Sequence, residues 1–395
     1  MKVKFLDLGM QPIANGFLEK TSSEEEFFYN LSMGFDEDTY LVSQMEFVEP
    51  EMMFNDSYVY HSSLSSTMRN HFGLAAETFV KEFDCERVLE IGSNDGVFLK
   101  HFSNESAVSV EPCGNFAKMT TEMGYTTYCD FWDLDLSREI VEKSGKFDLV
   151  FAANCMCHIQ NIEETFLAVK NCLTDTGVFI FEDPSLLRMI ERGSYDQLYD
   201  EHVHMFSVIA LSNMFEKIGM EIFKVENLSV HGGSNRIYAK SKSNSKIEID
   251  SSVAENVKEE RIAALDRASA YFNFASKVEK SKEALITMLR EIKSQGKKIV
   301  SYGATSKSTT VFNYCQITPE IIDYIVDITP SKQGKMSPGV HIPVVDYDTM
   351  FDSSVDVAFL GAWNYIEEIS NKENEFLKNG GEFITHVPEV RRISG

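Results

Sequence analysis

Runs of apolar residues recur along the middle of the chain, separated by stretches with helical spacing. A run that is apolar at nearly every position predicts a strand covered on both faces, and alternation with helices predicts a parallel sheet built of βαβ units. Before the first run, residues 68–83 carry apolar side chains at helical intervals and predict a helix. The runs are RVLEIG at 87–92, AVSVE at 107–111, FDLVFAAN at 147–154 and GVFIFE at 177–182.

The same alternation starts again after Gly296, and it predicts a second, smaller α/β domain. Residues 247–295 are charged and read as long helices, whereas residues 1–66 have mixed polarity and predict short strands and loops. We therefore expect a small N-terminal domain at 1–66, a central α/β domain at 67–245, and a helical linker with the smaller α/β domain at 246–395. The later runs are KKIVSYGA at 297–304, IIDYIVD at 321–327, VDVAFLG at 355–361 and GEFITHV at 381–387.

Charge and cysteine content narrow the function classes. With 37 Lys and Arg against 61 Asp and Glu, the net charge is -24, which disfavours a nucleic-acid partner because such a protein needs a basic face. We expect no membrane partner either, since no apolar stretch is as long as a membrane helix requires and the first residues lack a signal core. Seven cysteines without a Cys-x-x-Cys pair fit a reduced, cytoplasmic protein with no cysteine zinc site.

The turn after the first strand is rich in small and polar residues. Gly92 and Gly96 allow a tight turn and close approach of the backbone to a ligand. The spacing differs from the G-x-G-x-x-G of dinucleotide-binding folds. It resembles instead the E/D-x-G-x-x-x-G loop of class I S-adenosylmethionine (SAM)-dependent methyltransferases, which makes SAM the expected cofactor. Its candidate binding residues in this loop are Glu90, Gly92, Asn94 and Gly96.

Polar residues also end the strands that follow. Glu111 closes the second strand, where an acidic side chain can accept hydrogen bonds from both ribose hydroxyls. A solvated strand-end carboxylate is the alternative, and the position after an apolar strand favours the ribose role. Asp130 is a candidate near the adenine. Asn154 ends the strand at 147–154, where a ligand would cross the sheet edge, but polar strand ends are common and both interpretations stay open.

The segment SYDQLYDEHVHMF at 194–206 concentrates two Tyr, two Asp, one Glu and two His. His202 beside Glu201 offers a base with a pKa near neutral, and tyrosines can stabilise a developing oxyanion. The alternatives are a hydrophilic loop or a metal site on His202 and His204, and we favour base catalysis over metal binding.

A second glycine pair occurs at 231–236, between two strand-like runs. A plain hairpin turn would explain the two glycines. The neighbouring His and Arg favour a segment that lines the same cleft as the 194–206 segment. The candidate substrate-binding residues here are His231, Gly232, Gly233, Ser234 and Arg236.

Taken together, these blocks resemble the bacterial nucleotide-sugar C-methyltransferases, which methylate deoxysugars of antibiotics and surface polysaccharides. The resemblance runs nearly end to end. The matching blocks are LEIGSNDGVFL (89–99), YDQLYDEHVHMFS (195–207), VHGGSNRIY (230–238), LDLGMQPIANGFL (6–18), YVYHSS with MRNHF (58–63 and 68–72), YGATSKSTTVFNY (302–314), VDITPSKQGKMSPGVHIPV (326–344) and GAWNY (361–365).

One feature departs from that family. Its N-terminal domain normally binds zinc through two Cys-x-x-Cys pairs, but no such pair precedes the D-L-G block, and Asp36 and Thr39 stand where the second pair would fall. Zinc is therefore not expected, and the N-terminal domain is a degenerate form that apolar packing must hold together.

The resemblance implies a class I Rossmann-like methyltransferase domain and a chemistry. The substrate would be a nucleotide-linked 4-keto-6-deoxy sugar, from which a base removes the C3 proton so that the enolate accepts a methyl group from SAM. By motif position, His202 is the base and Glu201 orients it or binds a sugar hydroxyl. Tyr199 and Tyr60 would face the enolate oxygen or the sugar, with His158 beside them.

The C-terminal domain would help to hold the substrate. Amides at the start of the helix after Gly303, together with Lys307, could bind its diphosphate, although a structural turn would also explain this segment. Two other functions stay open. One is an O-methyltransferase of a sugar or small molecule, and the other is a non-catalytic scaffold, which the intact cofactor and base motifs disfavour.

Overall fold

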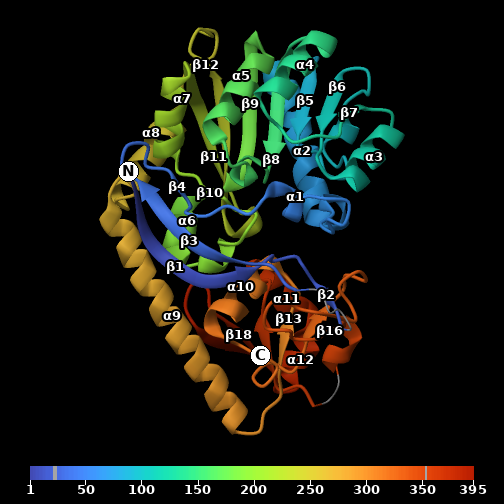
Figure 1. Cartoon of the computed structure of the whole chain (residues 1–395), viewed down its shortest axis with the longest axis vertical. Helices are drawn as coiled ribbons and strands as arrows, with labels where there is room; N and C mark the ends of the chain where they lie inside the picture. Colours follow the sequence, from blue (N-terminus) through green and yellow to red (C-terminus); the bar gives the residue numbers. More distant parts are fainter. Residues whose placement is uncertain (21–24, 352–353) are drawn as a thin grey trace.

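The computed structural model describes residues 1–20, 25–351 and 354–395. Figure 1 shows the central part of the chain above and the C-terminal part below, with the first strands running between them. The described residues form sheets of seven, six and four strands and one two-stranded ribbon. No helix of the described residues is long and apolar enough to cross a membrane.

The central sheet has the order β11-β12-β9-β8-β5-β6-β7. The strands from β9 to β7 are parallel, while β12 runs antiparallel to β9 and β11 antiparallel to β12. The predicted α/β class and the four predicted strands are confirmed. The strands are β5 (Val88–Ile91), β6 (Ala107–Val110), β7 (Thr126–Tyr128), β8 (Phe147–Ala153), β9 (Leu173–Pro184), β11 (Met220–Leu228) and β12 (Ser234–Ser241).

Helices cover this sheet and bury its apolar side chains. The predicted helix at 68–83 is α2 (Ser66–Phe83), which starts where the Ser65 side chain accepts a hydrogen bond from the Met68 amide and ends at Asp84 in a left-handed conformation. On the sheet itself, side chains such as Phe147, Phe151 and Phe179 are fully buried. The other helices of this part are α1 (Pro50–Met53), α3 (Gly114–Glu122), α4 (Leu134–Ser144), α5 (Ile162–Cys172), α6 (Leu186–Arg192) and α7 (Val208–Lys217).

The N-terminal residues form longer strands than the sequence predicts. β1 (Lys2–Pro12) and β3 (Phe28–Asp36) pair over most of their length, and β4 (Val42–Gln44) and the short β10 (His204–Met205) complete the sheet. The prediction of short strands was wrong for β1 and β3, because register shifts in β1, at Lys4/Leu6 and Asp7/Met10, interrupt the alternation of buried and exposed positions. β10 belongs to the 194–206 segment, so this sheet joins the N-terminal residues directly to that segment.

The long helices predicted at 247–295 are α8 (Ser251–Ile262) and α9 (Ala268–Ser294). Figure 1 shows α9 along one side of the molecule, reaching from the central part to the C-terminal part. Its Tyr271 ring stacks on Phe35 of β3, with 4.5 Å between ring centroids. Apolar packing thus holds the N-terminal sheet against the rest of the chain.

The C-terminal sheet has the order β16-β14-β13-β17-β18-β19, in which only the β18–β19 pair is antiparallel. It confirms the predicted second α/β unit, while the exact domain boundaries stay a prediction. Its elements are β13 (Ile299–Tyr302), α10 (Ser306–Cys315), β14 (Ile325–Asp327), β16 (Val344–Asp346), β17 (Val357–Leu360), α11 (Ile366–Lys372), α12 (Asn374–Lys378), β18 (Glu382–Thr385) and β19 (Arg391–Ser394). A separate ribbon pairs β2 (Leu18–Glu19) with β15 (Lys335–Met336).

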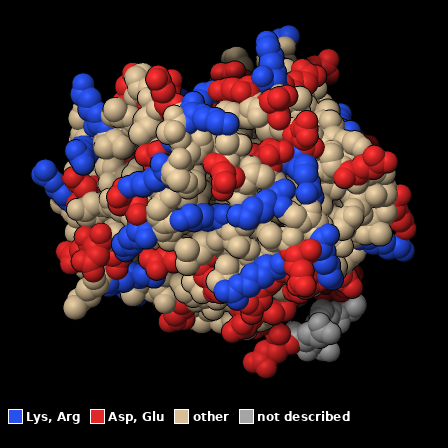
Figure 2. Space-filling model, turned by 90° about the horizontal axis from the view of Figure 1, so that it is seen from above, with Lys and Arg blue, Asp and Glu red and all other residues tan. Residues whose placement is uncertain are grey.

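Short 3₁₀ turns connect several of these elements. They are η1 (Ser62–Leu64), η2 (Leu99–His101), η3 (Met156–His158), η4 (Tyr195–Gln197), η5 (Val230–Gly232), η6 (Tyr347–Phe351) and η7 (Trp363–Tyr365). On the face seen in Figure 2, Lys and Arg side chains are interspersed among Asp and Glu, so no broad basic surface covers it.

Candidate active site

A cavity of about 340 Å³ lies at the carboxyl ends of the central parallel strands. The strand order reverses between β5 and β8, and open α/β sheets bind ligands at such a switch point. Seven residues proposed from the sequence line the cavity: Gly92, Asn94, Glu111, Asn154, Tyr60, His158 and His231.

The glycine loop is shaped so that Gly92 cannot carry a side chain. Its φ is +72°, and a Cβ atom built on it would lie 2.8 Å from the sulfur of Cys155. Asn94 next to it also has a positive φ, of 48°. Its side-chain oxygen accepts a hydrogen bond from the Ser62 amide at 3.0 Å. The loop thus presents backbone, rather than side chains, toward the cavity.

Glu111 stands across from this loop. Its two carboxylate oxygens accept hydrogen bonds from the backbone amides of Asn94, at 2.7 Å, and Cys113, at 2.9 Å. These bonds fix the carboxylate at the cavity wall. Burial raises the pKa of Glu111, and the two amides oppose that shift. A carboxylate held in this way suits the ribose-binding role predicted for it.

The other predicted cofactor residues lie outside the cavity lining. Glu90 is buried in β5, and burial together with the nearby Glu111 and Asp95 raises its pKa well above the usual range. Gly96, with φ +74°, packs near Thr120 and Met123 of the α3 region. Asp130 is exposed, and its carboxylate accepts a hydrogen bond from the next amide in the chain.

The predicted base, His202, is buried and has both ring nitrogens engaged. Nδ1 lies 2.7 Å from the carbonyl oxygen of Gln197, which can only accept, so Nδ1 carries the proton and donates it. Nε2 therefore has a free electron pair and accepts from the Tyr199 hydroxyl at 2.7 Å. Burial, followed by repulsion from His158, lowers the pKa of His202 well below the usual range. The imidazole is oriented by Gln197 and Tyr199 rather than by Glu201.

Stacked rings connect His202 to the cavity wall. His158 lies between Phe54 and His202, with centroid distances of 5.4 Å to each. Burial lowers the pKa of His158 to about 3, so its ring is neutral. Its Nε2 atom is buried and finds no hydrogen-bond partner among the described residues. A polar atom of this kind at a cavity wall is suited to contact a polar ligand.

Glu201 is held by two donors, one on each carboxylate oxygen. The Asn15 side-chain amide donates to Oε1 at 2.7 Å, and the Tyr58 hydroxyl donates to Oε2 at 3.0 Å. Burial raises the pKa of Glu201, while Asn15, Tyr58 and Lys332 oppose that rise. Tyr60, which the sequence singled out, is 44% exposed and lines the cavity instead of contacting this carboxylate.

In the 231–236 segment, His231 lines the cavity and the two glycines pack against neighbouring elements. His231 has a positive φ, of 53°, and lines the cavity, and burial lowers its pKa to about 4. A Cβ atom at Gly232 would lie 2.7 Å from the Trp363 ring, and one at Gly233 would lie 3.0 Å from Cβ of Arg188. These two glycines let the turn pack closely against its neighbours.

The remaining residues of the segment, from Ser234 onward, belong to β12. The Ser234 hydroxyl donates to the Val230 carbonyl at 3.3 Å. Arg236 is occupied by two carboxylates, with Nε 2.7 Å from Glu182 and Nη1 3.0 Å from Glu226. Because this ion pair is buried, Arg236 stabilises the sheet and is not the ligand-binding cation that the sequence suggested.

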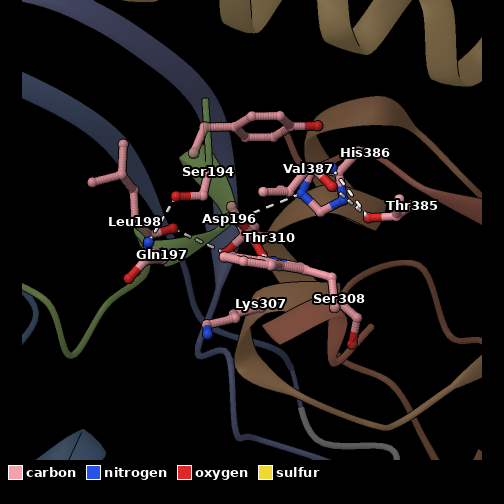
Figure 3. Close-up of polar contacts among 12 residues, drawn as sticks. Ser194, Asp196, Gln197, Leu198, Lys307, Ser308, Thr310, Thr385, His386 and Val387 are labelled. Atoms are coloured by element: carbon pink, nitrogen blue, oxygen red, sulfur yellow. Dashed lines mark hydrogen bonds and ion pairs between the residues drawn. The ribbon is translucent and has the colours of Figure 1, made fainter. Parts of the chain in front are cut away.

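Residues of the C-terminal part contact the 194–206 segment, which carries His202. Asp196 is fully buried, accepts a hydrogen bond from the Trp363 indole at 2.5 Å and lies 3.4 Å from His386 Nε2. Figure 3 shows Asp196 facing His386, with Gln197 and Leu198 on the same stretch of chain. The Thr310 hydroxyl donates to the Leu198 carbonyl at 3.0 Å. The carbonyl of Gln197 that orients His202 thus belongs to a turn that the C-terminal part holds in place.

Two lysines from the C-terminal part approach the same region. Lys307 lies over the Trp363 ring at 5.2 Å and donates to the His231 carbonyl at 3.4 Å. Lys332 donates to the Ala304 carbonyl at 2.7 Å. Burial lowers the pKa of both ammonium groups, opposed by Asp196 at Lys307 and by Asp327 and Glu201 at Lys332. Gly303, with φ +94°, precedes the helix that carries Lys307.

The predicted degenerate zinc site at Asp36 and Thr39 lacks suitable zinc ligands. The Asp36 carboxylate accepts hydrogen bonds from the Thr39 amide, at 2.9 Å, and from its hydroxyl, at 3.0 Å. The first cysteine of the chain is Cys85, so the thiolates that structural zinc prefers are absent from this domain. Asp36 and Thr39 form a closed turn and do not fit a zinc site.

Near the base, one group of potential metal ligands lies together. Among the described residues, Cys157, His158 and His202 have ligand atoms within 4.8 Å of one another. Both nitrogens of His202 already have hydrogen-bond partners, however. His204, the second member of the metal pair considered from the sequence, faces the Gln160 carbonyl at 3.2 Å. The arrangement favours a base over a metal ligand at His202.

Several residues of the site escaped sequence reasoning. Asn15 and Lys332 lie far along the chain from the residues they face, although both fall within blocks that resemble the family. Tyr58 was passed over for its neighbour Tyr60. The aromatic residues Phe54, Phe131 and Trp132 of the cavity wall carried no sequence signal beyond their apolar character.

Three family models match consecutive parts of the chain: a putative zinc binding domain at residues 1–54, a methyltransferase domain at 68–225 and a C-methyltransferase C-terminal domain at 229–388. The chain belongs to the SAM-dependent methyltransferases. It is 29% identical to the C-methyltransferase NovU of Streptomyces niveus, over 98% of this chain and 94% of that protein.

Two solved methyltransferase structures match part of the chain. The magnesium protoporphyrin IX methyltransferase ChlM of Synechocystis PCC 6803, with bound SAM, is 10% identical with a TM-score of 0.33, over 44% of this chain and 79% of that chain. The CurJ carbon methyltransferase is 12% identical with a TM-score of 0.34, over 46% and 57% of the two chains.

Proposed function

We propose that this enzyme transfers a methyl group from SAM to C3 of a nucleotide-linked 4-keto-6-deoxy sugar. The observation that carries the proposal is His202, a buried neutral imidazole with its electron pair on Nε2, one ring away from the cofactor cavity. Removal of a proton from the carbon next to a ketone needs a base of this kind. An O-methyltransferase would instead deprotonate a hydroxyl, which requires no adjacent ketone. The full-length similarity to a C-methyltransferase supports the same choice.

The cavity wall suits the cofactor. Gly92 packs against Cys155 without a Cβ atom, so its backbone can approach the cofactor closely, and the fixed carboxylate of Glu111 can accept from two ribose hydroxyls. Phe131 and Trp132 offer apolar surface to a purine, and Asn154 lies at the β8 end of the cavity. Bound SAM supplies an electrophilic methyl group that is already activated.

His202 and Tyr199 would act together on the substrate. In the resting site the Tyr199 hydroxyl donates to Nε2. When Nε2 takes the C3 proton, it becomes a donor toward the Tyr199 oxygen, and the hydroxyl proton of Tyr199 can turn to the enolate oxygen. One proton is gained by the imidazole, and one hydrogen bond is redirected to the charge that develops. The low pKa of His202 keeps the imidazole unprotonated at neutral pH.

The remaining polar groups would hold the sugar and its diphosphate. Glu201 can accept a hydrogen bond from a sugar hydroxyl, and the unpaired Nε2 of His158 can contact a second polar group of the sugar. Lys307 and Lys332 supply two positive charges beside the 194–206 segment, here called the catalytic segment, which fits a diphosphate. Since all seven cysteines are free thiols, we place this reaction in the cytoplasm.

A screen of nucleotide-linked keto sugars with ¹³C-methyl SAM tests the proposal. We expect a product whose labelled methyl shows the ¹³C shift of a methyl on carbon and a coupling to C3. A labelled methyl on oxygen would establish the O-methyltransferase alternative. Absence of transfer to any keto sugar, with transfer to an unrelated acceptor, would reject the substrate class.

A further inference from the structure

The segment between β1 and β2 crosses the catalytic site, although it belongs to the N-terminal part. The Ala14 amide donates to Asp200 Oδ1 at 3.0 Å, and the Ala14 carbonyl accepts from the Thr309 hydroxyl at 3.0 Å. Three residues further on, the Phe17 ring lies 4.9 Å from the Lys332 ammonium. Residues 14–17 are therefore fixed to the catalytic segment on one side and to the C-terminal part on the other.

A second N-terminal residue holds the same catalytic segment. The buried side-chain amide of Gln44, in β4, donates to the carbonyls of Tyr199, at 2.8 Å, and of His202, at 3.0 Å. Its backbone amide donates to the Val203 carbonyl at 2.8 Å. The N-terminal sheet thus fixes the backbone on both sides of Glu201 and leaves the side chain of Glu201 to Asn15.

We propose that Asn15 is a positioning residue of the active site, and that it holds the Glu201 carboxylate ionised and aimed at the substrate. The Asn15 amide donates to Oε1 at 2.7 Å and leaves Oε2 to Tyr58. The N-terminal domain thus has a role in catalysis that needs no metal. This inference rests on the proposed function, in which Glu201 contacts the sugar.

The surroundings of Glu201 make this amide important. Glu201 is 4% exposed, and the carboxyl group beside it, Asp200, also has a pKa raised by burial and by Glu201, to about 8. The ammonium group of Lys332 favours the ionised form of Glu201. The other titratable neighbours have raised pKa values and stay neutral: Tyr29, Tyr58, Tyr60, Tyr199, Cys113 and Cys157. Removal of one donor therefore shifts the ionisation of Glu201 directly.

The test compares three variants for methyl transfer to the keto-sugar nucleotide across pH. Asn15→Ala removes the donor and is expected to lower kcat about 10-fold to 100-fold and to move the acid limb of the kcat profile up by about one pH unit. Asn15→Asp, which has the same size, should move the limb further because it places two carboxyl groups together. Asn30→Ala is the control, since Asn30 makes a similar bond to Asp7 in the same domain at 2.9 Å.

The outcomes separate this inference from the proposed function. A shifted limb in both Asn15 variants, with unchanged SAM binding by calorimetry and a wild-type profile in Asn30→Ala, supports the positioning role. A wild-type profile in the Asn15 variants, or a rise in KM alone, overturns it. If Asn15→Ala does not fold, Asn15→Asp decides the question. A wild-type enzyme that leaves every keto sugar unchanged would instead reject the proposed function.

Discussion

Replacing His202 tests the chemistry of the proposed base. His202→Ala removes the ring that joins the Gln197 carbonyl to the Tyr199 hydroxyl, at 2.7 Å on each side. We expect this variant to lose methyl transfer and exchange of the C3 proton together, because both reactions require the same enolate. SAM binding should remain, since His202 contributes nothing to the cavity lining.

The magnitudes follow from what each variant loses. Loss of a general base costs about 10²-fold to 10⁴-fold in rate, and we expect His202→Ala to fall in that range. Tyr199→Phe should cost less, about 10-fold to 100-fold, because it removes one hydrogen bond to the enolate oxygen, and a bond to a charged group contributes about 1.5–3 kcal/mol. The ratio between the two variants thus distinguishes a base from its hydrogen-bonding partner.

The assay follows the C3 proton by NMR with keto-sugar nucleotide in deuterium oxide, in the presence and absence of cofactor. Circular dichroism and calorimetric SAM binding check that each variant is folded. Exchange at the wild-type rate in folded His202→Ala would refute the assignment of the base. In that event His158, whose unpaired Nε2 lies at the cavity wall, becomes the next candidate.

Three further predictions concern the cofactor, the fold and zinc. Gly92→Asp should abolish SAM binding in calorimetry because its Cβ atom would crowd Cys155, whereas Gly296→Ala, with a similar φ of +76° and open space around it, should bind normally; near-native affinity in folded Gly92→Asp would exclude the loop. Arg236→Met removes one of the two partners of the buried Glu182 carboxylate, leaving His71 at 2.6 Å, and should cost about 3 kcal/mol in urea unfolding, while the exposed pair of Arg138 should contribute less than about 1 kcal/mol; equal losses would contradict the structural role. Elemental analysis should find less than one zinc per chain, and stoichiometric zinc would overturn our interpretation of the N-terminal domain.

The fold was largely predictable because its signal is local. Strands β5, β6, β8 and β9 are apolar along nearly their whole length, and helices with regular spacing separate them. β1 was harder to predict, because its register shifts place side chains out of strict alternation. Its length depends on pairing with β3, which is a contact between distant residues.

Site residues next to predicted strands were also easier to predict than those that depend on contacts between distant residues. Gly92 and Glu111 follow strands directly, so their positions could be predicted from the sequence. Asn15 faces Glu201 across 186 residues of chain, and a single sequence carries no sign of that contact. Arg236 was misinterpreted for the same reason, because its partner Glu182 lies 54 residues earlier and only the structure shows that its charge is already paired.

The fate of the C3 hydrogen tests the central claim most directly. A nucleotide-linked 4-keto-6-deoxy sugar deuterated at C3 is incubated with the wild-type enzyme and unlabelled SAM. The mass of the product is then measured by mass spectrometry. The account predicts a product that has gained a methyl group and lost its deuterium, because the methyl group replaces that atom on C3. A methylated product that keeps the deuterium would contradict the account and place the methyl group elsewhere on the sugar.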